Sequence, residues 1–207
     1  MTTDPERQAQ LDAIAAEVNV CVKCPLHKAR TKAVPGSGPV TAPIMFIGEG
    51  PGFHEDQQGL PFVGASGKYL DDLLQGIGLN RTEVYITNVV KCRPPGNRDP
   101  RPDEIDTCAD YLDRQIALIN PKIIITLGRF SMAKWFPNAQ ISKIHGQPKK
   151  IGGRVYLPMY HPAAALRNPK LLAEVEADFK KIPDILKEMA TLRDDSPPPA
   201  AQQLSLF

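Results

Sequence analysis

The sequence predicts an α/β protein: a three-layer α/β/α sandwich around a four-stranded parallel central sheet. Two observations support this fold class. Four short apolar runs, at residues 44–47, 84–90, 123–127 and 155–159, alternate with longer segments whose apolar residues recur at helical spacing. Such alternation is typical of a parallel sheet with helices on both faces. With 207 residues, 42% of them hydrophobic, the chain is long enough to bury one sizeable core.

Helix boundaries follow from caps, apolar spacing and glycines. Asp4 is the expected cap of the first helix, because a proline suits the first turn and apolar residues then recur at helical spacing up to Val18. A helix from Asp103 carries Cys108 on its apolar face. Other helices are expected to begin near Ser66, Gly128 and Leu171, the last of them running to Met189.

The charge and the N-terminal segment narrow the class of protein. The formal net charge of +2 is compatible with nucleic-acid binding but does not require it. No apolar run reaches the length of about 18 residues that a membrane span needs, so no membrane association is expected. The first ten residues lack the basic and apolar regions of a secretory signal, which favours a cytoplasmic protein.

The composition changes near residue 190. Residues 191–202 are rich in proline, alanine and charged side chains and cannot form a core of their own. We therefore expect one folded domain over residues 1–190, a flexible linker over 191–202 and a short separate peptide over 203–207. This apolar peptide either serves as a binding motif or packs back on the domain.

The four cysteines of the chain are Cys21, Cys24, Cys92 and Cys108. Disulfides are not expected in a reducing cytoplasm. The C-x2-C pair together with two more cysteines suits a metal centre, since a tetrahedral zinc site and an iron–sulfur cluster both take four thiolates. The alternative is a chance C-x2-C pair and two buried cysteines. Spacing alone does not decide between zinc and iron–sulfur.

Polar residues gather at the carboxyl ends of three predicted strands. Glu49 follows the first strand, Asn88 lies at the end of the second, and His161 follows the fourth. Ligands of α/β proteins bind at these strand ends. Three glycines within residues 48–52 let backbone N–H groups approach a ligand closely. The sequence therefore predicts a binding or active site at this edge of the sheet.

Four motifs occur in order along the chain, interleaved with the cysteines: GEGPGFHED, GLPFVG, TNVVKCRPPGNRDP and HPAAALRNP. Together they resemble the family 4 uracil-DNA glycosylases, which carry a [4Fe–4S] cluster, over about residues 10–190. The resemblance implies an enzyme that flips uracil out of DNA, hydrolyses its N-glycosidic bond and leaves an abasic site. It also implies a structural cluster, without a redox step, bound by Cys21, Cys24, Cys92 and Cys108.

The resemblance also implies roles for the residues of the predicted site. Phe62 would stack on the base, and Asn88 would read its edge, because one amide offers both a donor and an acceptor. Glu55 would exclude a 5-methyl group, and His161 would donate to uracil O2 as negative charge builds there. The implied uracil-binding residues are Glu49, Gly50, Pro51, Phe62, Asn88 and His161, and the implied catalytic residues are Glu49, Glu55 and His161.

The group that activates the attacking water stays open. Better-known uracil glycosylases have an aspartate where this chain has Gly50. Glu49 and Glu55 are the candidate carboxylates. The backbone amides of residues 50–52 are a third option.

Residues beside these motifs are expected to contact DNA. Leu166 or Arg167 would fill the gap left by the flipped base, unless this segment merely ends a helix ahead of Pro169. The expected phosphate contacts are Lys91, Arg93, Arg98 and Arg101.

The peptide QLSLF at residues 203–207 resembles the pentapeptide by which bacterial replication and repair proteins bind the sliding clamp. The clamp-binding residues would be Gln203, Leu204, Leu206 and Phe207, with Leu206 and Phe207 in an apolar pocket. The linker would tether the enzyme near the replication machinery. The expected partners of the chain, taken as a monomer, are uracil-containing DNA and the clamp.

Two other functions fit parts of the pattern. One is a damage-binding iron–sulfur protein that does not turn over or that traps DNA covalently. The trapping branch of the family has an insertion between Asn88 and Cys92, where this chain has only three residues. The other is an electron-transfer protein, in which Phe62, Asn88 and His161 would have no role.

Overall fold

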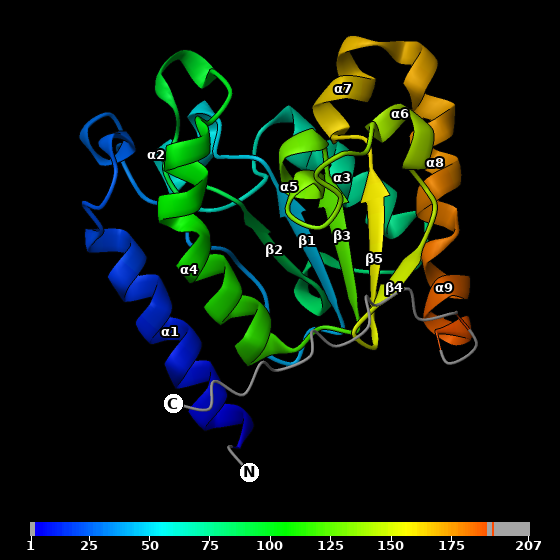
Figure 1. Cartoon of the computed structure of the whole chain (residues 1–207), viewed down its shortest axis with the longest axis horizontal. Coiled ribbons are helices and arrows are strands. Elements are labelled where there is room, and N and C mark those ends of the chain that lie inside the picture. The colour runs from blue at the N-terminus through cyan, green and yellow to red at the C-terminus, as the bar shows by residue number, and fades with distance from the viewer. Residues whose placement is uncertain (1–2, 190–191, 193–207) are drawn as a thin grey trace, which may run out of the picture.

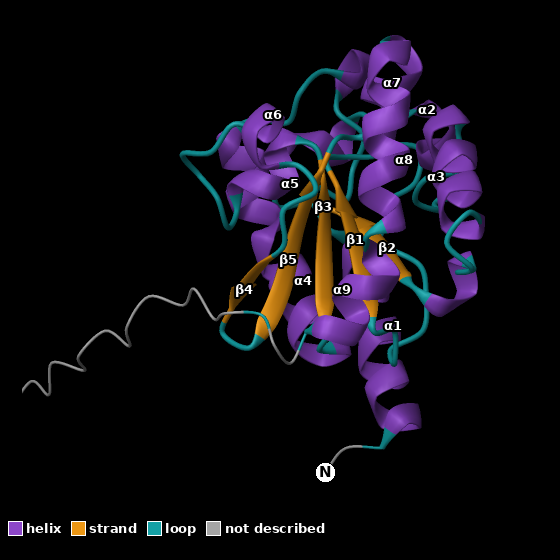
Figure 2. Cartoon of the chain, turned by 90° about the vertical axis from the view of Figure 1, so that its right-hand side faces the viewer, coloured by secondary structure: helices purple, strands orange, loops and turns teal. Residues whose placement is uncertain are grey.

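The computed structural model describes residues 3–189 and 192, and the strands within them form one five-stranded sheet of order β2-β1-β3-β5-β4. The strands are β1 (Ile44–Gly48), β2 (Tyr85–Asn88), β3 (Ile123–Leu127), β4 (Lys149–Ile151) and β5 (Arg154–Met159). All pairings are parallel except that of β4 with β5 at one edge. Helices cover both faces of the sheet (Figures 1 and 2), which confirms the predicted three-layer α/β/α sandwich.

The sheet has one strand more than the four predicted. The four predicted apolar runs are the four parallel strands. The sequence pattern does not reveal β4, because this edge strand has only three residues, two of them lysines, and none of them is fully buried. A short polar edge strand lacks the apolar run that marks a buried strand.

Two predicted helix features are wrong in detail. The cap of the first helix is Thr3, which forms a reciprocal capping box with Glu6, and not Asp4. The helix predicted over 171–189 is interrupted at Lys181, because Pro183 lacks the N–H that would continue the hydrogen-bond ladder. The helices of the described chain are α1 (Asp4–Val20), α2 (Phe53–Gln58), α3 (Ala65–Gln75), α4 (Pro102–Ile119), α5 (Arg129–Ala133), α6 (Ile141–Ile144), α7 (Pro162–Arg167), α8 (Leu172–Lys180) and α9 (Ile182–Glu188), with 3-10 turns η1 (Pro25–Lys28), η2 (Arg81–Glu83), η3 (Pro95–Asn97) and η4 (Pro169–Leu171).

Successive residues of each strand point to opposite faces of the sheet and contribute to two apolar layers, one on each face. Phe46 of β1 lies in the layer that includes residues of α3, α8 and α9, and its ring stacks on that of Phe179 at 6.0 Å between centroids. Met45 and Ile47 lie in the opposite layer with residues of α1 and α4. Every residue of β1 and β3 is buried. This burial on both faces explains why the strands read as continuous apolar runs.

The strand order places a crevice at the carboxyl edge of the sheet. The chain passes from β1 to β2 on one side of β1 and then crosses to β3 on its other side. At such a switch point the loops that follow neighbouring strands diverge, and α/β proteins bind ligands between them. Glu49, Asn88 and His161 all stand at this edge. Among the helices of the described residues, none has the length and hydropathy of a membrane span.

Candidate active site

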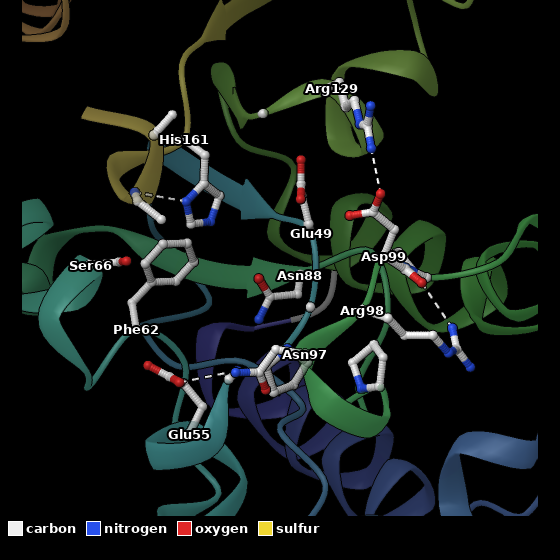
Figure 3. A pocket seen from close by; sticks show the side chains of 18 of the residues that line it. Glu49, Glu55, Phe62, Ser66, Asn88, Asn97, Arg98, Asp99, Arg129 and His161 are labelled. Carbon is white, nitrogen blue, oxygen red and sulfur yellow. Dashed lines mark hydrogen bonds and ion pairs between the residues drawn. The ribbon is translucent and has the colours of Figure 1, made fainter. Parts of the chain in front are cut away.

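A cavity of about 490 Å³ opens at the carboxyl edge of the sheet (Figure 3). Its size is in the range of small-molecule sites. Residues from four separate motifs meet there, as the sequence predicts. The predicted site residues that line it are Glu49, Gly50, Pro51, Glu55, Phe62, Asn88, Arg98, His161 and Arg167.

Asn88 is the last residue of β2 and pairs in register with Gly48 of β1. Its side-chain Oδ1 is buried and has no hydrogen-bond partner within the described chain. A Cβ at Gly48 would stand 2.4 Å from this oxygen and 2.7 Å from the Phe62 ring, so only glycine fits between them. A buried acceptor without a donor is costly. The Asn88 amide is therefore prepared for a donor that a ligand supplies.

Phe62 forms one wall of the cavity. Its ring lies against that of His161, with centroids 5.5 Å apart and an interplanar angle of 24°. Its φ of 53° is in the left-handed region, which costs a non-glycine residue energy. Arg81 supports this conformation by donating to the Phe62 carbonyl at 2.8 Å and to the Pro61 carbonyl. The strained loop holds the ring over the space beside Asn88.

His161 caps α7 with its own side chain, since Nδ1 accepts a hydrogen bond from the Ala163 N–H at 3.1 Å. In the neutral ring the proton then sits on Nε2, which becomes a donor. Burial lowers the pKa of His161 to about 4; nearby Arg167 also lowers it, whereas Glu55 opposes the shift. The imidazole is thus uncharged at neutral pH, and its Nε2–H is the donor that it can offer to a ligand.

Glu49 follows β1 and lies at the start of α5. Burial raises the pKa of its carboxyl group, and a hydrogen bond from the Phe130 backbone opposes that rise. A Cβ at Gly128 would stand 2.4 Å from Glu49 Oε1, and Gly128 has a φ of +95°. Glycine at 128 therefore makes the room in which this carboxylate lies.

Both oxygens of Glu55 accept hydrogen bonds from backbone N–H groups. Oε1 accepts from the N–H groups of Val63 and Gly64 at 2.8 and 2.9 Å, and Oε2 accepts from Gly52 at 3.1 Å. These bonds join α2 to the loop that carries Phe62. Glu55 therefore lines the cavity and also stabilises the loop that forms its wall.

Several lining residues were not predicted. Ser66, Asn97, Asp99 and Arg129 also face the cavity. Arg129 and Asp99 form an ion pair at its rim (Figure 3). Arg129 is the second residue after the end of β3, so the strand-end rule that selects Glu49 could have selected it. Asp99 lies in a loop without such a signal.

The expectation that Lys91 contacts phosphate is wrong. The residue is only 2% exposed, and its ammonium donates to three protein acceptors. Burial lowers the pKa of this ammonium to about 8. A scattered basic residue usually reads as a surface residue, and only the fold reveals that this one is inside.

Arg93 and Arg98 remain near the surface beside the cavity. Arg93 donates to Asn97 Oδ1 at 2.6 Å and lies over the Phe53 ring at 5.1 Å. Arg98 binds both oxygens of the buried Glu104, at 2.7 and 2.9 Å.

The segment with Leu166 and Arg167 is the end of α7. The side chain of Leu166 is 45% exposed, although it is large and apolar. Arg167 lines the cavity and is the last residue of the helix, and Asn168 caps the following turn by accepting from the Lys170 N–H. The segment thus ends a helix and also presents an apolar side chain near the cavity mouth.

The four cysteines converge on a second, smaller cavity. Cys21 follows α1, Cys24 precedes η1, Cys92 lies in the loop after β2, and Cys108 is in α4. Arg30 Nη1 donates to Cys92 Sγ at 3.1 Å.

Electrostatics at the cysteines depend on burial and on nearby cations. Burial raises the thiol pKa values of Cys24, Cys92 and Cys108; Arg30 opposes this at Cys92, and Lys91 opposes it at Cys108. No group of three or more His, Cys, Asp or Glu side chains in the described chain encloses a single ion. Four thiols around one cavity are the kind of donor set that a group held by four thiolates requires.

The fold and the first cavity define an α/β protein with a cavity at its strand ends, lined by the Phe62 ring and the Asn88 amide. Residues 35–187 match the sequence profile described as the uracil DNA glycosylase superfamily, and the chain belongs to this superfamily.

Relatives named type-4 uracil-DNA glycosylase match over most of their length. The one from Archaeoglobus fulgidus is 48% identical over an alignment of 195 residues, and the match covers 89% of this chain and 98% of the relative. The one from Thermotoga maritima is 40% identical over 88% of this chain and 97% of its own. A type-5 uracil-DNA glycosylase from Thermus thermophilus is 32% identical over 63% of this chain and 68% of its own.

Proposed function

We propose that the protein is a DNA-repair enzyme that flips uracil out of DNA, hydrolyses its N-glycosidic bond and leaves an abasic site. The observation that carries this proposal is the buried Asn88 Oδ1, which has no donor within the described chain. The N3–H of uracil is a donor of the required kind. The relatives named type-4 uracil-DNA glycosylase support the same activity.

Recognition of uracil follows from Asn88 and Phe62. The Asn88 amide accepts from N3–H and donates to O4, while the Phe62 ring covers one face of the base. Cytosine reverses the donor and acceptor at these two positions and would leave buried groups unpaired. Glu55 closes the space beside the 5-position, and the backbone of Gly50 and Pro51 lines the remaining edge.

His161 supports departure of the base. As the glycosidic bond breaks, negative charge builds at uracil N1 and O2. A neutral imidazole whose Nδ1 is already an acceptor can donate from Nε2 to that charge without giving up its proton. Donation to a developing oxyanion is worth about 100- to 1000-fold in rate.

We assign the attacking water to Glu49. Burial raises the pKa of this carboxyl group, which makes its ionised form a stronger base. The three backbone hydrogen bonds of Glu55 go to Gly52, Val63 and Gly64, so this carboxylate holds the loop that carries Phe62. A carboxylate at position 49 also stabilises the cationic sugar. Glu49 thus takes over the part of the aspartate that Gly50 replaces.

DNA would approach along the mouth of the cavity. Leu166 presents an exposed apolar side chain that can occupy the stack when the base leaves it. Arg93, Arg98 and Arg167 lie at or near the mouth and are the proposed phosphate contacts.

The excision assay tests the proposal directly. Purified full-length protein is incubated with single- and double-stranded oligonucleotides that carry one uracil, and abasic sites are detected by alkaline cleavage. Matched oligonucleotides with cytosine or thymine at the same position serve as controls. We expect abasic product from uracil alone. Protein with its full iron content that yields no abasic product contradicts the proposal.

The cysteine cavity would hold a [4Fe–4S] cluster through Cys21, Cys24, Cys92 and Cys108. When bound, such a cluster supplies structural cross-links and no redox step in base excision. The four thiols come from separate segments, so the cluster would join the end of α1 to the loop after β2 and to α4. Analysis of purified protein should find about four iron and four sulfide per chain. Zinc in place of iron contradicts this assignment.

Residues 203–207 are proposed to bind the sliding clamp. They lie outside the described residues, as does the linker 191–202 apart from Leu192. The support is the sequence QLSLF, tethered by a proline-rich segment to the domain over 1–190. Deletion of Gln203 to Phe207 should abolish clamp binding and leave excision of short oligonucleotides unchanged. Equal clamp affinity after the deletion contradicts the assignment. A monomeric state and a cytoplasmic location remain predictions.

A further inference from the structure

A fully buried lysine lies beneath the active site. The side chain of Lys91 donates to Thr87 Oγ1 at 2.6 Å, to Gln115 Oε1 at 2.8 Å and to the Asn88 backbone carbonyl at 2.9 Å. An ammonium has three hydrogens, so these acceptors satisfy it completely. Placing an ammonium in the interior is costly unless all of its partners are present. The three acceptors therefore hold the ammonium at one defined position in the interior.

Two of the three acceptors are the last two residues of β2. The Asn88 carbonyl belongs to the residue whose side chain faces the cavity, and Thr87 precedes it. The Thr87 hydroxyl in turn donates to the Pro35 carbonyl at 2.9 Å. Lys91 thus contacts the end of β2 from the protein interior, while the Asn88 side chain lines the cavity.

The third acceptor anchors the ammonium to a separate element. Gln115 comes from α4 and is itself fully buried. Its Nε2 donates to the Pro35 carbonyl at 2.9 Å and to the Tyr85 hydroxyl at 3.1 Å. Each member of this network constrains another, so the position of Lys91 Nζ is set by α4 and the loop at Pro35 together.

The main chain of Lys91 is held as well. Its carbonyl accepts from the Val34 N–H at 2.8 Å, and its N–H is a hydrogen-bond donor to the Cys108 thiol. After β2 the chain continues along β1, with Val89 N–H donating to the Gly48 carbonyl at 3.0 Å. Residues 88–91 therefore form a short fixed connection between the base-reading residue and the cysteine site.

We propose that Lys91 is a positioning residue for uracil recognition. Its ammonium fixes the Asn88 peptide, so that the Asn88 amide meets the N3–H and O4 edge of uracil in a single orientation. The inference rests on the proposed function. It predicts that loss of the ammonium weakens binding of uracil itself and reduces discrimination against cytosine, in addition to lowering excision.

The test compares Lys91→Met with Lys122→Met. Methionine keeps the length of the side chain and removes all three donors, and Lys122 is an exposed lysine at the other end of the sheet. Three quantities are measured on iron-loaded protein: excision in single turnover, inhibition by free uracil, and the ratio of uracil to cytosine excision. For Lys91→Met we expect about a 10- to 100-fold loss of excision, weaker inhibition by uracil and a lower ratio. Lys122→Met should match the wild type.

A second variant keeps the inference testable if Lys91→Met does not fold. Thr87→Val preserves shape, removes one acceptor of the ammonium and touches no cysteine. It should lower uracil affinity in the same direction by a smaller factor. Unchanged uracil affinity and ratio in folded Lys91→Met, or in Thr87→Val where the former is unfolded, overturns the positioning role. A wild-type protein that excises no uracil overturns the proposed function instead.

Discussion

The cavity at the strand ends and the cysteine cavity are linked by residues 88–92, but they are built differently. The cavity takes Glu49, Asn88 and His161 from the ends of three parallel strands, whose spacing the sheet sets. The cysteine cavity takes its four thiols from loops and helices of separate segments. A sheet sets the backbone spacing of its strand ends, whereas loop segments need a cross-link. We infer that the first site is preformed and that the second depends on the group it binds.

The two cavities also differ in the charge of the side chains that surround them. In the cavity at the strand ends, burial lowers the pKa of His161 to about 4 and thereby keeps the ring neutral. Beside the cysteines, Arg30 and Lys91 oppose the rise in thiol pKa that burial causes. The first cavity thus keeps the His161 donor uncharged, whereas the cysteine cavity places Arg30 and Lys91 where they favour the thiolate form of the cysteines.

Replacing a cysteine should have the largest effect. Cys92→Ala removes the thiol that Arg30 contacts and that belongs to the loop after β2. We expect loss of nearly all bound iron and a lower thermal unfolding midpoint, because metal binding and folding are coupled. Thr107→Ala, which lines the same cavity without a thiol, is the matched control. Wild-type iron content in Cys92→Ala would show that the cysteine region is not the cluster site.

Replacing His161 should affect chemistry without affecting the cysteine region. His161→Ala removes the Nε2 donor, and we expect about a 100- to 1000-fold lower single-turnover rate of uracil excision. Iron content should equal that of the wild type, because the strand ends hold their places without the cluster. A parallel loss of iron would contradict the independence of the two regions.

The neutral His161 should also make stability depend on pH. Its pKa falls from 6.5 to about 4 in the folded protein, so the unfolded chain takes up a proton where the folded chain does not. This contribution to stability is complete above about pH 6.5 and is lost as the pH falls toward 4. The loss is on the order of 3 kcal/mol. Urea unfolding at several pH values should show it in the wild type and not in His161→Ala; an equal loss in both would assign it elsewhere.

Replacing Asn88 should change the rate of uracil excision less than it changes the discrimination between uracil and cytosine. Asn88→Asp replaces the amide donor with an oxygen, which suits the amino group of cytosine better than O4 of uracil. We expect the ratio of uracil to cytosine excision to fall about tenfold or more. Asn80→Asp, at an exposed position before β2, is the control. A ratio equal to that of the control would mean that Asn88 does not read the base.

Sequence alone determined the fold class and the location of the site. Strands buried on both faces are mostly apolar, so β1, β2, β3 and β5 are visible as runs, although β2 also holds the buried polar residues Thr87 and Asn88. Residues at the ends of such strands meet at one edge in any parallel sheet, so Glu49, Asn88 and His161 could be grouped from the sequence alone. These two features can be read from the sequence because they depend only on the local pattern of apolar residues and on the fact that parallel strands end at the same edge of a sheet.

Only the tertiary structure decided what individual polar side chains do. The lysine at position 91 reads as a surface charge, yet the strand order brings Gln115 and the loop at Pro35 around it. Glu55 reads as a free carboxylate, yet residues 63 and 64 turn their backbone donors toward it. Whether a charged group meets water or protein partners depends on segments far away in the sequence. Those segments are placed by packing, which no local pattern encodes.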